Sequence, residues 1–525
     1  MNLWSWRRAA GVSFSDRLLL AALIAAGIGA TIRLVDWWFR EIHVAEPVLF
    51  ILLSLAFWYG IGRILVGWFN VIAMSRPAEK PAPQFLRVAI FTTSSPGEPL
   101  SMFEKTLAAC ANISYPHTTY LLDDTRDPRF REVAERHGAV WLELVGIPGA
   151  KAGKINAALE KTNEQFILVL DPDHIPFPNF LDRVLGFFDN PDVGFVQVSQ
   201  AYYNQSRSFV ARAAAEQTYA FYGPVLMGMN GHGTGLAIGA NCTFRRSALE
   251  SIGGHGVGLA EDLVTTIRLH AAGWKSVYVP EILSRGLVPE DLGSFFKQQL
   301  KWARGVYEIL FTELPVLFSK LTWRQRLSYL MIGTYYLCGV TTFTYLVIPY
   351  LYLWLGIQPA SMPFGGFIFS VLPVGLLGGL VYLYAQRWLC HAEHEKGLHW
   401  RGLILKVGSW PIYLLGTILA IMKKDIPYIP TSKEAKTGRF LSLAWPHVVV
   451  AVLYVLTVVR VVWDRLVDTP RAELVLTAEV VWGMVAFATM TVVMTSGVFY
   501  AAWKTTRPIP GMAWDAVDVG KDMSS

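Results

Sequence analysis

The chain has 525 residues, of which 53% are hydrophobic and 16% are charged, and its mean hydropathy is positive. This composition departs from that of soluble domains and indicates a membrane protein. The net charge of +6 is small for this length, and no basic block is interleaved with aromatic residues, so nucleic acid is not expected as a partner. The 4 cysteines lie far apart without a Cys-x-x-Cys pair, which argues against a disulfide framework and a zinc site.

Two apolar runs open the chain, one from Leu18 to about Val35 and one from about Pro47 to Met74. Each is long enough to cross a bilayer. Three arginines precede the first run and place the amino terminus in the cytoplasm, and two crossings return the chain to that side. A Pro-rich linker follows. We therefore expect residues 1–83 to form two transmembrane helices and a linker.

Residues 84–325 have the mixed composition of a soluble domain. The short apolar runs RVAIFTT, TTYLLDD and AVWLELV alternate with helical patterns, which predicts βα units and a doubly wound parallel sheet. Open sheets of this type bind ligands at the carboxyl ends of their strands.

The stretch FILVLDPDHIPF contains the most informative carboxylates of this domain. Phe166 to Leu170 predict a buried strand, so Asp171 and Asp173 fall on the loop at its carboxyl end. Two carboxylates spaced in this way can share Mg²⁺ or Mn²⁺ with the diphosphate of a sugar nucleotide. Taken alone, an Asp-x-Asp is more often a solvated loop or a helix cap.

Other polar residues are expected at the same edge of the sheet. Asp123 and Asp124 end the run TTYLLDD, and PGAKAGKINAALE places Lys151 and Lys154 at the start of a helix. Free backbone N–H groups and lysines at a helix start suit a phosphate, although an ordinary helix start with solvent-facing lysines fits equally well.

Two later segments also carry candidate residues. Glu261 and Asp262 precede an amphipathic helix in GLAEDLVTTIRLHAAGW, where the helix dipole alone favours carboxylates. The amphipathic segment SFFKQQLKWARGVYEIL contains Gln298, Lys301 and Trp302. By itself this segment is typical of an interfacial helix with aromatic anchors and snorkelling cations.

Four further spans are expected in residues 326–525, at about 329–355, 366–384, 441–463 and 474–503. Residues 402–422 are apolar but contain Lys406 and Pro411, and we assign them to the membrane interface. A crossing there would place the cationic segment 423–439 outside, against the positive-inside rule. The total is six crossings.

Taken in order, these motifs resemble those of the processive family 2 glycosyltransferases, the membrane-embedded synthases of cellulose, curdlan, chitin and hyaluronan. The resemblance covers roughly residues 84–440. It implies an α-helical transmembrane bundle with an inserted cytoplasmic α/β domain of the GT-A-like, nucleotide-diphospho-sugar transferase type. It also implies a multi-pass protein of the bacterial cytoplasmic (inner) membrane.

The resemblance assigns roles to the first group of candidates. LLDDTRD is similar to the acidic motif that holds the uridine, which implies donor binding by Asp123 and Asp124. AKAGKINAAL resembles the Lys-Ala-Gly segment and implies that Lys151 contacts the diphosphate. DPDHIP resembles the Asp-x-Asp motif and implies that Asp173 ligates Mg²⁺ or Mn²⁺ with Asp171 close by.

The second group follows in the same way. AEDL resembles the family's Thr-Glu-Asp and implies Asp262 as the catalytic base, with Glu261 as the alternative. QQLKW resembles Gln-x-x-Arg-Trp and implies substrate binding by Gln298, Lys301 and Trp302.

A third resemblance concerns the loop at 423–439. YIPTSK looks like the gating loop of cellulose synthase, with Thr431 and Lys433 matched. Three features depart from the family pattern: Ala260 replaces Thr, Lys301 replaces Arg, and VQVSQAYYN stands where the cellulose enzymes carry Gln-Thr-Pro. A lysine keeps the charge but loses the bidentate fork of arginine.

The chemistry of these residue types is consistent with that family. An acceptor hydroxyl loses a proton as it attacks the anomeric carbon, which requires a carboxylate base. A divalent ion with Lys151 and Lys301 can stabilise the leaving diphosphate, and the face of Trp302 can stack on a sugar ring. One direct displacement inverts the configuration of the sugar.

We therefore expect a processive inverting β-glycosyltransferase that uses UDP-glucose, elongates a β-glucan and moves it across the membrane. Its partners are the UDP-sugar donor, the growing polysaccharide acceptor and the lipid bilayer. One alternative is the same architecture with UDP-GlcNAc or UDP-GlcA. Others are a non-processive transferase acting on a lipid carrier, and a transporter with an incidental soluble domain, which fits poorly because the ionisable residues cluster in the inserted domain.

Overall fold

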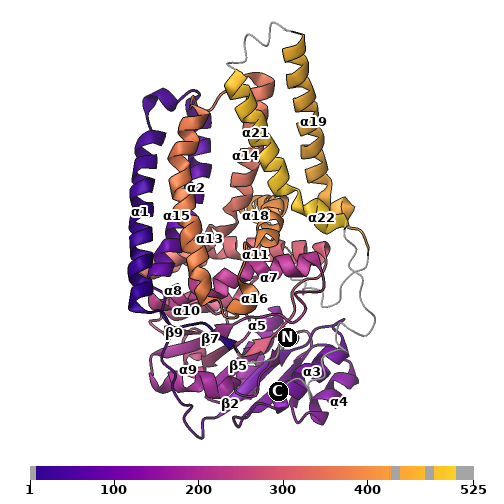
Figure 1. Ribbon diagram of the computed structural model, residues 1–525. Coiled ribbons are helices and arrows are strands. Elements are labelled where there is room, and N and C mark those ends of the chain that lie inside the picture. Colours follow the sequence, from indigo (N-terminus) through magenta and orange to yellow (C-terminus); the bar gives the residue numbers. More distant parts are fainter. Residues whose placement is uncertain (1–6, 425, 427–437, 468–477, 504–525) are drawn as a thin grey trace.

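The structure is a computed structural model that describes residues 7–424, 426, 438–467 and 478–503. Upright helices form one half of the molecule, an α/β domain forms the other, and a layer of flat-lying helices separates them (Figure 1). Apolar helices precede the α/β domain in the sequence and others follow it, so this domain is inserted between two groups of apolar helices.

Within the described residues, six helical segments are long and apolar enough to cross a membrane, and they agree in number and order with the six expected crossings. They are Phe14–Trp38 (α1), Pro47–Ile72 (α2), Trp323–Leu355 (α13 to α14), Phe364–Trp388 (α15 and the short helix Gln386–Trp388), Leu441–Leu466 (the short helix Leu441–Ala444 and α19) and Val480–Trp503 (α21 and α22).

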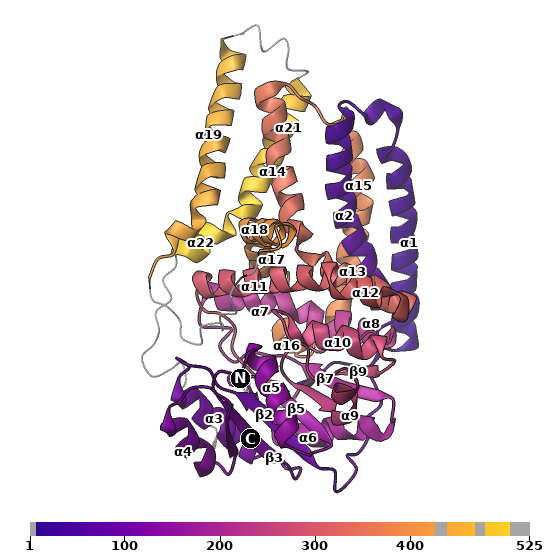
Figure 2. The same ribbon diagram turned by 180° about the vertical axis from the view of Figure 1, so that it is seen from behind.

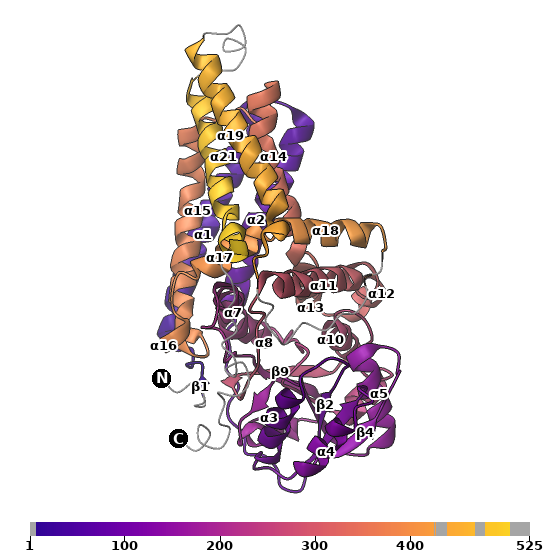
Figure 3. The ribbon, with the colours of Figure 1, turned by 90° about the vertical axis from the view of Figure 1, so that its right-hand side faces the viewer.

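The segment expected at the membrane interface forms two helices, α17 (Trp400–Gly408) and α18 (Trp410–Ile421). They are bent by 46° relative to each other. Figure 3 shows that α18 lies across the direction of the upright helices. Residues 402–422 therefore do not run as one straight span.

The main sheet of the α/β domain has eight strands in the order β1-β9-β7-β8-β5-β2-β3-β4. Its central strands are buried because each is a short, mostly apolar run. The strands are β1 (Arg7–Arg8), β2 (Val88–Thr93), β3 (Thr118–Asp123), β4 (Val140–Glu143), β5 (Phe166–Leu170), β7 (Val193–Ser199), β8 (Cys242–Arg245) and β9 (Lys275–Ile282). Two short strands, β6 (Ile175–Pro176) and β10 (Ser284–Arg285), form a separate antiparallel pair.

The prediction of an all-parallel sheet is wrong in one half of the sheet. β2, β3, β4 and β5 are parallel to one another, but β8 is antiparallel to both β5 and β7. After β7 the chain forms the membrane-side helices and then enters the sheet from the opposite end. An apolar run does not encode strand direction, which depends on the path of the connection.

The N-terminal strand β1 was not expected from the sequence. Arg7 and Arg8 pair with Ile282 and Glu281 at the edge of β9. Two residues are too few to produce a strand pattern, so only the tertiary structure reveals the pairing. The pairing holds the start of α1 against the α/β domain.

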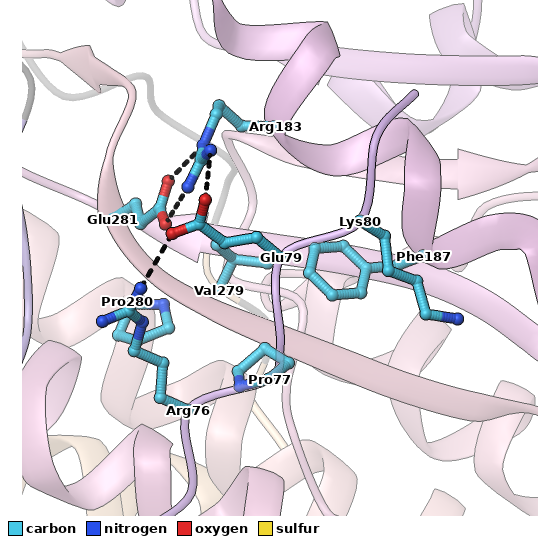
Figure 4. A pocket seen from close by; sticks show the side chains of 9 residues that line it. All are labelled: Arg76, Pro77, Glu79, Lys80, Arg183, Phe187, Val279, Pro280 and Glu281. Carbon is cyan, nitrogen blue, oxygen red and sulfur yellow. Dashed lines mark hydrogen bonds and ion pairs between the residues drawn. The ribbon is translucent and has the colours of Figure 1, made fainter. Parts of the chain in front are cut away.

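Ion pairs attach the linker after α2 to this domain (Figure 4). Arg183 binds Glu79 at 3.0 Å and Glu281 at 2.7 Å, and Arg76 binds Glu79 at 2.9 Å. The Arg183 guanidinium is the main reason why the pKa of Glu79 falls to about 2. The linker is therefore tied to α6 and β9 by charge as well as by chain connectivity.

The remaining helices either flank the sheet or lie between it and the spans (Figure 2). A single hydrophobic cluster contains buried residues of α1, α2, α10, α11 and β9, among them Trp68, Ile267 and Tyr307. This shared core joins the two halves of the molecule. These remaining helices are α3 (Leu100–Ala111), α4 (Pro128–Arg136), α5 (Ala150–Lys161), α6 (Phe180–Val184), α7 (Phe209–Ala220), α8 (Leu226–Gly231), α9 (Arg246–Ser251), α10 (Glu261–Ala271), α11 (Leu292–Phe311), α12 (Glu313–Leu317) and α16 (Ala392–Glu395). Within the later spans, the helices are α13 (Trp323–Gly333), α14 (Cys338–Leu355), α15 (Phe364–Ala385), α19 (Trp445–Leu466), α21 (Ala478–Thr495) and α22 (Gly497–Trp503).

Candidate active site

Asp123–Asp124 and Asp171–Asp173 lie at the same edge of the sheet, as expected. β3 and β5 lie on either side of β2 and run parallel to it, with Leu122 opposite Thr93 and Leu170 opposite Thr92. Their carboxyl ends therefore meet, and the loops that follow them lie next to each other.

Asp123 is buried within the scaffold. Its carboxylate accepts hydrogen bonds from the Ser94 hydroxyl, from the backbone N–H and hydroxyl of Thr125 at 3.0 and 2.8 Å, and from Trp141 Nε1 at 2.9 Å. These donors use most of its acceptor capacity. Asp124 is more exposed; it accepts the Gly146 N–H at 3.0 Å and lies 3.8 Å from Lys154 Nζ.

The predicted lysine-bearing helix is α5, which starts after Gly149 in a left-handed conformation, φ +92°. At Gly153 an added Cβ would lie 1.9 Å from the carbonyl oxygen of Pro148, so the close turn requires glycine there. This turn directs Lys151 inward, where its ammonium contacts the Asp171 carboxylate at 2.5 Å and the Gly239 carbonyl.

Asp171, Asp173 and His174 form the one group of three potential ligands found among the described residues. Their ligand atoms lie within 4.8 Å of one another. Asp173 is 2% exposed, and its carboxylate lies 3.2 Å from His174 Nδ1 and accepts the Leu287 N–H at 3.3 Å. Carboxylate oxygens suit Mg²⁺ or Mn²⁺, so Asp171 and Asp173 fit the expected divalent cation.

The Glu261–Asp262 pair occupies the first turn of α10. Asp262 Oδ1 accepts the Leu263 N–H at 2.9 Å, and its Oδ2 would lie 3.6 Å from a Cβ added to Gly239. Gly239 also has a left-handed conformation, with φ +79°. Because the Gly239 carbonyl contacts Lys151, this glycine connects Lys151 with the Glu261–Asp262 pair.

The charges at this junction influence one another. Burial is the main cause that raises the pKa of Asp262 to about 7; the Glu261 carboxylate adds to the effect, and the Lys151 ammonium opposes it. Burial alone would lower the pKa of Lys151, but the surrounding carboxylates, Asp171 foremost, reverse the sign and raise it. Asp262 is therefore a carboxyl whose pKa suits proton acceptance near neutral pH.

The Gln298, Lys301 and Trp302 side chains project from α11, on the face that also contains Gly305. A Cβ added to Gly305 would lie 2.9 Å from both Cβ and N of Ala260, so this face packs against the turn that begins α10. Trp302 is 39% exposed, and Gln298 and Lys301 are partly buried. The structure thus places the two motifs side by side, although no described contact joins Trp302 to Asp262.

Thr431 and Lys433 lie outside the described residues, and their assignment stays a prediction. The described flanks of the segment both contact α11. Arg304 Nε donates to the Lys424 carbonyl at 3.0 Å, and a Cβ added to Gly293 would lie 3.3 Å from the Phe440 ring.

Sequence reasoning did not identify His174, Gly239 and Gly305 as parts of this site. His174 directly follows Asp173 in DPDH, so its position was a usable signal. Gly239 and Gly305 matter because another backbone approaches them closely, and no local pattern encodes such an approach.

A family model described as "Glycosyl transferase family group 2" matches residues 166–383. The cellulose synthase catalytic subunit [UDP-forming] of Komagataeibacter sucrofermentans is 29% identical over 326 residues, which is 59% of this chain and 43% of that protein. The subunit of the same description from Xanthomonas axonopodis pv. citri is 28% identical over 342 residues, which is 62% of this chain and 47% of that protein. The chain thus matches less than half the length of these relatives.

Solved structures show weaker similarity. A mannosyltransferase from Pyrobaculum calidifontis in complex with GDP-Man and Mn²⁺ has 16% identity and a TM-score of 0.45, over 78% of this chain and 99% of that one. S. aureus TarS 1-349 has 14% identity and a TM-score of 0.32, over 66% and 94%. These similarities assign neither a donor nor a metal to this chain. The matched domain and the cellulose synthase relatives indicate that the chain is a glycosyltransferase with similarity to family 2, and they confirm the expected fold class, a transmembrane helical bundle with an inserted GT-A-like α/β domain.

Proposed function

We propose that this protein is a processive inverting β-glycosyltransferase that elongates a β-glucan from UDP-glucose and moves the product across a bacterial inner membrane. The observation that carries the proposal is the set of contacts through Lys151, which touches Asp171 and Gly239 and lies near the carboxylate of Asp262. In the proposal, the donor-binding and proton-accepting groups are therefore adjacent.

The proposed reaction is a single displacement. Asp262 accepts the proton of the acceptor hydroxyl while the hydroxyl oxygen attacks the anomeric carbon, and the bond from this carbon to the diphosphate oxygen breaks. Lys151 binds the departing diphosphate as a point charge. Because the attack occurs opposite the leaving group, an α-linked donor yields a β-linked product.

Asp171, Asp173 and His174 are the residues that would hold the divalent cation. Such an ion, when bound, neutralises negative charge on the diphosphate. Asp171 also contacts Lys151, so both positive charges of the donor site would be fixed by the same carboxylate loop.

The remaining assignments complete the proposal. We assign residues 1–83, 84–325 and 326–525 to the N-terminal spans, the cytoplasmic catalytic domain and the C-terminal membrane part. Asp124, with Asp123 behind it, would contact the uridine, and the α11 face with Gln298 and Lys301 would border the sugars. Thr431 and Lys433 would approach the nucleotide from the segment that follows α18.

The donor is tested with full-length protein in lipid nanodiscs and radiolabelled UDP-glucose, UDP-GlcNAc and UDP-GlcA, each with Mg²⁺. We expect an insoluble product from UDP-glucose that β-glucanases digest and chitinase and hyaluronidase leave intact. A polymer from another donor would favour the chitin-like or hyaluronan-like alternative. A single sugar transferred to extractable lipid would favour a lipid-carrier transferase.

The ionisation of Asp262 predicts the pH dependence of catalysis. Only the deprotonated carboxylate accepts a proton, and burial raises its pKa to about 7. We therefore expect kcat/KM to rise with pH up to about 7 and then to level off. In Asp262→Asn the residual kcat/KM should not show this rise with pH. A profile in wild type that is flat between pH 5 and 8 would contradict the assignment.

Trp302 is expected to position the acceptor. Trp302→Ala removes an exposed ring beside the α10 turn and leaves the donor loops unchanged, so polymer synthesis should fall by about 10-fold or more while UDP binding persists, as expected for loss of a stacking surface. Trp302→Phe should restore part of the rate. The matched control is Trp323→Ala, which removes a tryptophan that is 60% exposed at the start of α13. Equal losses in both variants would indicate membrane anchoring.

A further inference from the structure

A second polar pocket lies between the α/β domain and the inner end of α15. It is small and partly open to solvent. Residues of β10, of the segment after β7, of α7, of α16 and the residue before α16 line it. Helix α16 lies between the upright helices and the sheet (Figures 1 and 3). The principal lining residues are Arg285, His391, His394, Glu395, Tyr202 and Tyr219.

The central residue of this pocket is Arg285. Its side chain is 2% exposed, and Nε and Nη2 are buried without a hydrogen-bond partner among the described residues. Burial lowers the pKa of Arg285 to about 10. These two nitrogens form the edge of the guanidinium that binds two oxygens of one anion, and a buried guanidinium without such a partner is unfavourable.

Two histidines add donors to the same pocket. Arg7 Nε donates to His391 Nε2 at 3.3 Å, so the proton of the neutral ring is on Nδ1, which is buried without a partner in the described part of the chain. His394 Nε2 is likewise unpartnered there. The two rings lie 4.3 Å apart between centroids, and burial together with the charge of Arg285 lowers the pKa of both.

One carboxylate faces the pocket. Glu395 accepts the backbone N–H of His391 at 3.0 Å, and burial raises the pKa of Glu395 to about 7. Within the described residues no ion pair joins Glu395 to Arg285. Arg7 and Arg212 also lie beside the histidines, and Arg212 is paired with Glu216 at 3.1 Å.

We propose that Arg285, His391 and His394 form a binding site for a phosphate group, separate from the donor site. Donors on three side chains of two chain segments suit the several oxygens of a tetrahedral anion better than the two oxygens of a planar carboxylate. The bound phosphate would connect β10 with α16 and so tie the catalytic domain to the end of α15. Inorganic phosphate, a soluble phosphate ester and a lipid headgroup share this chemistry.

The test uses the full-length protein in phosphatidylcholine nanodiscs. Binding of radiolabelled inorganic phosphate and the thermal unfolding midpoint are measured at constant ionic strength, with chloride as the reference anion. We expect saturable binding and a higher midpoint in phosphate, because a ligand of the native state stabilises it. Arg285→Gln should weaken binding by about 10-fold or more, as expected for lost hydrogen bonds to a charged group. His394→Gln should weaken binding too and provides a second variant in case Arg285→Gln does not fold.

Controls separate this site from others. Lys151→Gln alters the donor site and should leave phosphate binding intact, as should Arg129→Gln at the surface. A second set of nanodiscs contains phosphatidic acid in place of added phosphate. A response to free phosphate that depends on Arg285 supports the site with a soluble ligand, and one seen only with phosphatidic acid supports a lipid ligand. If neither response depends on Arg285 or His394, the proposal is wrong.

Discussion

Asp262→Asn should reduce polymer synthesis by about two to four orders of magnitude, the scale of general base catalysis. The substitution keeps the shape of the side chain, and the amide oxygen can still accept the Leu263 N–H. It removes the carboxylate that takes the acceptor proton. Because the donor loops at Asp171 and Lys151 are unchanged, UDP should bind as in wild type. The measurement pairs a steady-state polymer assay with UDP titration calorimetry.

The control is Asp192→Asn, which alters a surface carboxylate paired with Lys275 at 2.8 Å and should leave the rate unchanged. Glu261→Gln tests the alternative base at the adjacent position. If Asp262→Asn lost UDP binding and turnover in parallel, its role would be to support the α10 turn. If Glu261→Gln alone abolished synthesis, the proton acceptor would be Glu261.

The positions of the aspartates at the strand ends could be predicted because they depend on local sequence patterns. Phe166 to Leu170 form an apolar run of strand length, and its end fixes the position of Asp171. The same reasoning placed Asp123 at the end of β3. Both strands proved parallel to β2, so their carboxyl ends meet as the alternating pattern indicated.

Features that depend on distant contacts could not be predicted in this way. The direction of β8 is set by the helices that precede it, and β1 exists because Arg7 and Arg8 meet the edge of β9. The lysine of AKAGK was identified, but its contact with the Gly239 carbonyl joins positions far apart in sequence. Such contacts result from packing between elements, and composition or periodicity does not record them.

The residues of the second pocket could not be predicted from the sequence either. His391 and His394 stand in a loop that follows a span, where the sequence indicated only a cytoplasmic location. Arg285 lies in a two-residue strand that no sequence pattern predicts. Their unpartnered nitrogens become informative only because the fold buries them together.

The second large effect concerns the divalent cation. EDTA should abolish polymer synthesis, and Mg²⁺ or Mn²⁺ should restore it, because the diphosphate carries more negative charge than Lys151 alone can balance. Asp173→Asn should lose most of the turnover, since it removes one carboxylate from the ligand group. Binding of Mn²⁺, followed by electron paramagnetic resonance in the presence of UDP, should weaken in the same variant and provides a readout that does not require activity.

The matched control for this prediction is Asp182→Asn, which changes a partly buried carboxylate on α6 away from the ligand group. It should bind Mn²⁺ like wild type. His174→Gln distinguishes the role of the imidazole: weaker Mn²⁺ binding would make His174 a ligand, and unchanged binding would leave it as the partner that orients Asp173 at 3.2 Å. Undiminished synthesis in excess EDTA would contradict the metal assignment of Asp171 and Asp173, because the diphosphate would then depart without the ion that these carboxylates are expected to hold.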